Sequence, residues 1–264
     1  MDLRLQGKTA LVTGSTSGIG EAIAVALAAE GVRVAINGRN VEAAERVIAE
    51  IGAARAVPAL GDLSTGEGVA SVAAAAEKQL GHVDILVNNA GQFNARPYDE
   101  VAEQDWVETF NNNFMSAVRL SRSLAPAMRE RGWGRIVGIG STAGSVPLTF
   151  VPDYSAMKSA LLSFSGSLAK SMAGTRVTSN VITSGIVKTP PLMRTVVQLA
   201  EAMGGDMEKA ERRMMTELNP SVAERMGEPF ELAALTAFVC SPLADYITGA
   251  NLRIDGGMLG HISI

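Results

Sequence analysis

Short apolar runs alternate with longer helical stretches along the whole of this 264-residue chain. The runs are nearly continuous in Val, Ile and Leu, which is typical of strands buried on both faces of a parallel sheet. Such strand–helix alternation predicts a parallel sheet with helices on both faces, a three-layer α/β/α fold. The predicted strands are 9–13, 32–37, 55–60, 83–88, 135–140, 177–182 and 250–255, and the predicted helices are 18–30, 41–51, 66–80, 100–131, 154–173 and 228–240.

One segment departs from this alternation. Residues 190–227 carry no strand pattern and hold six of the twelve methionines. We interpret them as a helical insertion after the sixth predicted strand, because no repeat, low-complexity tract or linker divides the chain. The sequence therefore predicts a single domain over residues 1–264.

Composition limits the partners of the chain. Its net charge of −4 argues against general attraction to nucleic acid or an anionic membrane. The single cysteine, Cys240, lies in an apolar stretch and is expected to be a buried thiol. We find no signal peptide and no apolar window of about 18 residues, so a cytoplasmic protein is expected. His82 and His261 have no metal-ligand partner at useful spacing, and no metal site is expected.

The first predicted strand runs into a turn with the spacing G-x-x-x-G-x-G and then an Ala-rich helix. Glycines in this context allow a tight turn, close approach of a pyrophosphate to the backbone, and close helix–strand packing. The helix N-terminus offers N–H groups to phosphates. The alternative is a turn that merely joins strand to helix. The residues expected to bind phosphate are Gly14, Ser15, Thr16, Ser17, Gly18, Ile19 and Gly20.

Tyr154 and Lys158 are spaced to share one face of a helix. Alone, such a pair is most simply a solvated surface. Other polar residues change that balance, because 88–91 (NNAG) and Ser141 each follow a predicted buried strand, at the sheet edge where ligands bind. Asn113 lies in a predicted long helix. Each residue also has a purely structural interpretation, as part of a turn, as a helix cap or as a polar position within a helix.

In order and spacing, TGSTSGIG, DL (62–63), NNAG, Asn113, Ser141, YSAMK and IDGG (254–257) resemble the motifs of the short-chain dehydrogenase/reductase family, in its single-domain form. The resemblance covers essentially the whole chain. It implies a Rossmann-like, doubly wound parallel sheet of about seven strands that binds a dinucleotide.

By this resemblance, Ser141 is expected to donate a hydrogen bond to a substrate carbonyl, and Tyr154 to act as general acid or base. A free tyrosine has a pKa of about 10, so a nearby cation must favour its phenolate. Lys158 is expected to supply that charge and to bind the nicotinamide ribose. Asn113 is expected to hold a water between Lys158 and solvent.

The resemblance also implies cofactor contacts beyond Tyr154, Lys158 and the glycine loop. The family usually has Pro-Gly after the sixth strand, where this chain has Ser184-Gly185, and this difference bears on loop rigidity. The further expected contacts are Asn37, Arg39, Asp62, Leu63, Asn89, Ala90, Gly91, Gly185, Ile186, Val187 and Thr189.

NADP is predicted in preference to NAD. An acidic residue at the end of the second strand would accept the ribose 2′-hydroxyl of NAD, but this position holds neutral Asn37. Gly38 then opens space, and Arg39 offers a charged fork to a 2′-phosphate. Ser17 stands where many NADP enzymes of the family have a basic residue, so stacking of Arg39 on adenine, with NAD as cofactor, is the alternative.

The predicted function is NAD(P)-dependent interconversion of a secondary alcohol and a ketone, with a small-molecule substrate. Within catalysis, the alternative is a 3-oxoacyl thioester reductase, and sugar, polyol and terpenoid alcohols stay open. A non-catalytic nucleotide sensor is the alternative from another class. Residues 190–227 are interpreted either as a substrate lid or as two packed helices, with 145–150 as an opposite apolar wall. The family resemblance and the small-residue helix 159–174 predict a homotetramer.

Overall fold

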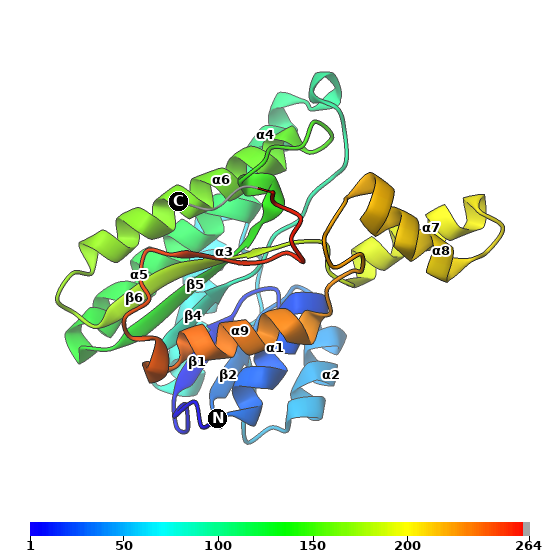
Figure 1. Cartoon of the computed structure of the whole chain (residues 1–264). Coiled ribbons are helices and arrows are strands. Elements are labelled where there is room, and N and C mark those ends of the chain that lie inside the picture. Colours follow the sequence, from blue (N-terminus) through cyan, green and yellow to red (C-terminus); the bar gives the residue numbers. More distant parts are fainter. Residues whose placement is uncertain (261–264) are drawn as a thin grey trace.

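The computed structural model describes residues 1–260, and His261 lies outside them. All seven strands are parallel and form one sheet in the order β3-β2-β1-β4-β5-β6-β7 (Figure 1). The predicted Rossmann-like sheet is therefore confirmed. The strands are β1 (Thr9–Val12), β2 (Arg33–Ile36), β3 (Ala56–Pro58), β4 (Ile85–Asn88), β5 (Gly134–Ser141), β6 (Val177–Ser184) and β7 (Asn251–Ile254).

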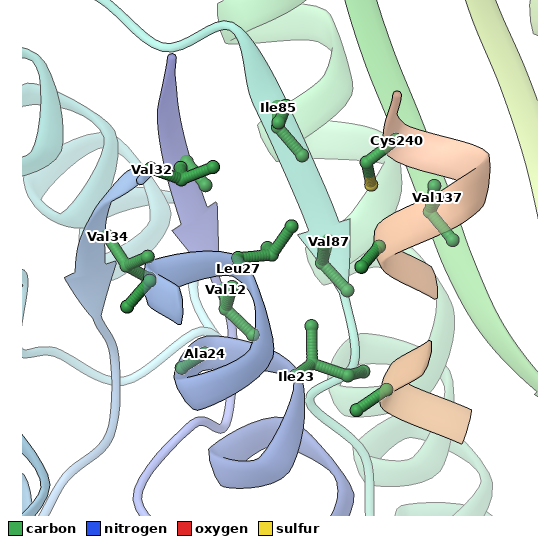
Figure 2. Close-up of a cluster of buried hydrophobic side chains, with 14 of the residues drawn as sticks. Val12, Ile23, Ala24, Leu27, Val32, Val34, Ile85, Val87, Val137 and Cys240 are labelled. Atoms are coloured by element: carbon green, nitrogen blue, oxygen red, sulfur yellow. The ribbon is translucent and has the colours of Figure 1, made fainter. Parts of the chain in front are cut away.

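Helices cover both faces of the sheet. One layer consists of α1 (Gly18–Ala29), α2 (Val41–Ile51) and α9 (Pro229–Cys240), and the other of α3 (Gly66–Leu80), α5 (Ser116–Arg131) and α6 (Pro152–Ser171). Side chains of β1 alternate between the two layers: Val12 packs under α1 with Ile23 and Leu27 (Figure 2), whereas Leu11 packs toward α3 and α5. Burial on both faces explains why the strands read as continuous apolar runs.

The predicted helix 100–131 is interrupted in the structure. It begins with the short turn η1 (Tyr98–Glu100) and α4 (Glu103–Phe110), and a π-helical turn, η2 (Asn111–Met115), then separates α4 from α5. The backbone N–H of Ser116 donates to Asn111 O, and the Ser116 hydroxyl donates to Asn112 O at 2.8 Å. Such π-turns are frequent at functional sites. Apolar periodicity did not reveal this one, because the backbone stays in the right-handed helical region at both ends of the π-turn.

The segment 190–227 is helical, as predicted. It contains α7 (Pro190–Ala202), α8 (Met207–Arg213) and the π-turn η4 (Met214–Leu218), which project from the sheet layers (Figure 1). Met214, Met215 and Met226 are buried with Val196 in a core of the segment's own. These three methionines therefore serve helix packing. The chain leaves and re-enters the sheet domain at a bridge between Val187 and Gly227.

Two short turns complete the chain: η3 (Thr142–Gly144) follows β5 and η5 (Pro242–Ala244) follows α9. Cys240 is buried, as predicted. No helix within residues 1–260 is both long and apolar enough to cross a bilayer.

A buried arginine stabilises the sheet edge opposite the glycine loop. Arg135 is fully buried and donates to the carbonyls of Ser241 and Arg176, to its neighbour Gly134 and to Asp245. Its guanidinium also lies 4.3 Å from the centre of the Trp133 ring. A buried charge is tolerated only when it is paired and hydrogen-bonded, and Asp245 supplies the opposite charge.

We therefore expect Asp245→Ala to lower the free energy of unfolding by about 2–3 kcal/mol, because it leaves the Arg135 charge without its carboxylate. Urea unfolding measures this. Glu50→Ala is the control, because the Arg46–Glu50 pair is half exposed on both sides and should contribute less than about 1 kcal/mol. Equal effects of the two substitutions would contradict this account of Arg135.

Candidate active site

The loops after β1 and β4 meet at the carboxyl edge of the sheet, where the strand order reverses. Ligands of doubly wound sheets bind at such a reversal. The Asn89 side chain donates to Thr13 O at 2.8 Å and to Gly14 O at 3.1 Å, and Ala90 N donates to Thr13 Oγ1 at 2.9 Å. A Cβ on Gly20 would lie 2.3 Å from Gly14 O, so only glycine allows this approach of helix to turn.

The glycine-loop residues divide into two groups. Ser15 and Gly20 are buried, and the Ser15 hydroxyl donates to Val12 O at 2.7 Å, so both hold the turn in shape. Ser17 is exposed and forms the N-cap of α1, yet its side chain makes no capping hydrogen bond. A helix N-terminus without a side-chain cap fits the pyrophosphate of a dinucleotide. The residues left accessible beside it are Gly14, Thr16, Gly18 and Ile19.

Asn37 follows β2, but its side chain faces the interior of the protein. It is buried, its Oδ1 accepts from Gly14 N at 3.2 Å, and its Nδ2 donates to Ala59 O at 2.9 Å. These bonds occupy the amide, so Asn37 braces the glycine loop against β3. Gly38 does not face open space, since Thr16 packs where its Cβ would be.

Arg39 is exposed just beyond Asn37. Asp62 lies close enough to respond to its charge: hydrogen bonds from Ser64 lower the pKa of Asp62, and Arg39 lowers it further by a smaller amount. Leu63, expected to contact adenine, is buried in the core with α3. Of Asn37, Arg39, Asp62 and Leu63, only Arg39 and Asp62 are thus exposed.

Ser141 and Tyr154 come together at the end of β5. Ser141 Oγ accepts from Ala143 N at 3.2 Å as the cap of η3, and it lies close enough to the Tyr154 phenol to influence the pKa of that group. Burial raises the pKa of Tyr154 to about 12, and the nearby Ser141 hydroxyl opposes that rise. The phenol is therefore protonated at neutral pH. The cap interpretation of Ser141 is confirmed, and its role in a catalytic site stays a prediction.

Lys158 lies one turn along α6 from Tyr154 and is buried. Its Nζ donates to Ile139 O at 2.7 Å and lies 5.5 Å from the centre of the Tyr154 ring. Burial lowers the pKa of Lys158 to about 8. We expected this ammonium to lower the pKa of Tyr154, but in the structure desolvation dominates both groups and the ammonium is directed at a main-chain carbonyl.

Asn113 lies in the π-turn and faces the loop after β4. Its Nδ2 donates to Gln92 O at 2.9 Å and to Thr109 O at 3.2 Å, while its Oδ1 accepts from Gln92 N at 3.1 Å. Both amide donors are thus used within the protein. Gly91 passes between this amide and Lys158. A water at this place would find one remaining acceptor position on Oδ1.

The loop after β6 reaches the glycine loop. Thr189, at the start of α7, packs against Gly18, and Gly185 packs against Asp255. Ser184, which replaces the usual proline, is buried and its hydroxyl donates to Gly140 O at 3.2 Å, so the loop keeps an anchor to β5. Val187 is buried, whereas Gly185, Ile186 and Thr189 are partly accessible.

Sequence reasoning missed Phe93. Its ring centre lies 5.5 Å from that of Tyr154, with the planes tilted by 53°. The same loop is joined to 145–150 by a 2.7 Å hydrogen bond from Arg96 N to Phe150 O. Phe93, Val146 and Phe150 each expose about half of their surface. No sequence pattern links an irregular loop to a ring 61 positions away, so only the fold reveals this contact.

The chain matches the family model for short chain dehydrogenase over residues 8–199. It is 42% identical over 264 residues to the uncharacterized oxidoreductase YvaG of Bacillus subtilis, covering 98% of each chain. It is 37% identical over 255 residues to D-beta-hydroxybutyrate dehydrogenase of Cupriavidus necator, covering 96% of this chain and 98% of that protein. L-sorbose reductase of Gluconobacter frateurii, solved with NADPH and L-sorbose, superimposes with a TM-score of 0.95 at 35% identity, over 99% of this chain and 100% of that one. The chain belongs to the short-chain dehydrogenase/reductase family of oxidoreductases.

The buried lysine generates a pH prediction. Its pKa is about 8 in the folded protein against an ordinary 10.5, so between these values the unfolded chain binds more protons. The free energy of unfolding should therefore rise with pH in wild type relative to Lys158→Met, by up to about 1.4 kcal/mol per pH unit between pH 8 and 10.

Urea unfolding at successive pH values measures that difference, with Lys170→Met, an exposed position of the same helix, as control. Parallel stability curves for wild type and Lys158→Met would show that the folded protein does not depress this pKa.

Proposed function

We propose that this protein is an NADP-dependent oxidoreductase that interconverts a secondary alcohol and a ketone, with Tyr154 as general acid and base. The single observation that carries the proposal is the grouping of Ser141, the Tyr154 phenol and buried Lys158 at the carboxyl edge of β5, close enough for the Ser141 hydroxyl to lower the pKa of Tyr154. The uncapped N-terminus of α1 lies at the same edge of the sheet. A sensor that only binds nucleotide needs no such phenol–hydroxyl pair.

The residues of the chain have distinct parts in a carbonyl reduction. A reduced nicotinamide, when bound, supplies the hydride that adds to the carbonyl carbon. Ser141 donates a hydrogen bond to the carbonyl oxygen and stabilises the negative charge that grows there. Tyr154, protonated because its pKa is about 12, transfers its proton to that oxygen. Lys158, with a pKa of about 8, stays largely charged at neutral pH and favours the resulting phenolate.

The preference for NADP rests on Arg39. Its side chain is exposed at the end of β2, where an acidic residue would exclude a 2′-phosphate. The related L-sorbose reductase was solved with NADPH. Asp62 lies close to Arg39, and its negative charge reduces the positive potential of this region.

On the substrate side we propose a small ketone with an apolar group beside its carbonyl. Phe93 covers one side of Tyr154, and exposed Val146 and Phe150 lie on the loop hydrogen-bonded to the Phe93 loop. Activity toward an aromatic methyl ketone, compared with L-sorbose and a 3-oxoacyl thioester, tests this preference. A higher kcat/KM for the sugar would contradict it, and a higher value for the thioester would favour the alternative of a 3-oxoacyl thioester reductase.

Tyr154→Phe should lower kcat by about 10²–10⁴-fold, because only the transferable proton is removed. NADPH binding, followed by fluorescence titration, should change little. Tyr98→Phe is the control, since Tyr98 is exposed on η1 and should leave kcat unchanged. Retention of more than about a tenth of the wild-type rate would contradict the general-acid assignment.

Arg39→Ala should lower the ratio of kcat/KM for NADPH to that for NADH by about ten- to a hundredfold, the worth of one exposed charge-assisted contact. Arg33→Ala, at the other end of β2, should leave the ratio unchanged. If wild type uses NADH as well as NADPH, or if Arg39→Ala keeps the NADPH preference, Arg39 does not select the cofactor.

We also propose a homotetramer. Small residues on α6, within 159–174, and its partly exposed outer positions suit close helix contact with a second copy. Light scattering at micromolar concentration tests it, and a monomer would contradict it.

A further inference from the structure

A buried carboxylate stands immediately before Tyr154. Asp153 is the second residue of α6 and is 2% exposed, which is unusual for an aspartate without a charged partner. Its Oδ2 accepts a 2.6 Å hydrogen bond from the hydroxyl of Thr109, on α4, which is itself buried. The first turn of a helix also favours a negative charge. None of the proton-transfer steps above uses Asp153.

The same threonine contacts the other side of the site. Its main-chain carbonyl accepts from Asn113 Nδ2 at 3.2 Å, and that amide in turn holds the backbone of Gln92 by two hydrogen bonds. Thr109 therefore joins the first turn of α6 to the π-turn and, through it, to the loop after β4. Three segments of the site share this one connection.

The first turn of α6 is also joined to the loop before it, because Ser155 Oγ accepts from Leu148 N at 3.2 Å. Its N-cap, Val151, makes no side-chain capping bond, and the irregular loop 145–151 precedes it. One turn later Lys158 is held by the 2.7 Å bond to Ile139 O, on β5. Tyr154 thus lies in the part of α6 that the Asp153–Thr109 bond ties to α4.

We propose that Asp153 and Thr109 form a positioning pair that holds the Tyr154 hydroxyl in line with Ser141. This inference rests on the proposed function. The pair acts through geometry, because burial and the Ser141 hydroxyl are the influences that move the pKa of Tyr154. Misplacing a reacting group by about 1 Å can lower the rate about 10²-fold, so the loss of this one hydrogen bond can lower kcat measurably.

Five variants test the pair by kinetics with NADPH and a ketone substrate. Asp153→Ala and Thr109→Val should each lower kcat about 10–100-fold and leave the dissociation constant of NADPH within about twofold. Their double variant should be little worse than either single one, because both remove the same bond. Asp153→Asn and Thr109→Ser keep an acceptor and a donor, and should retain kcat within about threefold.

Thr236→Val is the matched control. Thr236 is a fully buried threonine whose hydroxyl donates to Leu232 O within α9, far from this connection. It should lower thermal stability without lowering kcat. A kcat loss for Thr236→Val as large as for Thr109→Val, or additive losses in the double variant, would overturn the proposal.

Hydrogen–deuterium exchange tests the Asp153–Thr109 hydrogen bond independently of enzyme activity. In Asp153→Ala, the amides of Ser155 and Ala156 should lose protection about tenfold relative to the rest of α6, and Asp153→Asn should restore it. Unchanged protection would overturn the positioning role whether or not the enzyme is active. Absence of turnover in wild type, with protection lost as expected, would instead contradict the proposed reaction alone.

Discussion

The hydrogen bonds between the loops after β1 and β4 are the interaction on which the rest of the site depends. Asn89 reaches across to the carbonyls of Thr13 and Gly14, and Asn37 holds the same turn from the side of β2. Because both strands are buried on both faces, their ends cannot shift without disturbing two layers of packing. The glycine turn is therefore rigid before any ligand arrives, and the free N-terminus of α1 faces a fixed direction.

The second half of the site depends on burial more than on charge pairing. Desolvation raises the pKa of Tyr154 to about 12 and lowers that of Lys158 to about 8, so two pKa values that are ordinarily close move apart and each group is pushed toward its neutral form. At neutral pH the phenol is protonated and the lysine largely charged, which is the state that the proposed reduction requires. The Ser141 hydroxyl favours the phenolate and so opposes part of the effect of burial.

Much of this architecture could be predicted from the sequence, for physical reasons. Strands that are buried on both faces consist of consecutive apolar residues, and the close approach of α1 to β1 requires a glycine at position 20. Both features can be recognised in a short stretch of sequence. The interruption at Asn111–Met115 was missed, because a π-turn adds one residue without breaking the helix. Asn37 and Leu63 were expected to face a cofactor, yet tertiary packing turns both inward.

Residues that act through distant partners could not be found from sequence patterns. Phe93 meets Tyr154, and Thr109 meets Asp153, only because the sheet order brings α4, α6 and the loop after β4 together. From the sequence, Arg135 is an ordinary charged residue at the start of a strand, but in the structure it is fully buried and paired with Asp245. In each case the decisive information is the partner, and the local sequence does not contain it.

The most direct test of the account follows the hydride itself. NADPH carrying deuterium at its transferable position would be incubated with the protein and a panel of ketones, and each alcohol product analysed by mass spectrometry and NMR. The account predicts deuterium on the carbinol carbon of the reduced ketone. Bound NADPH with no labelled alcohol from any ketone would contradict it, and would leave a nucleotide-binding protein without carbonyl reductase activity.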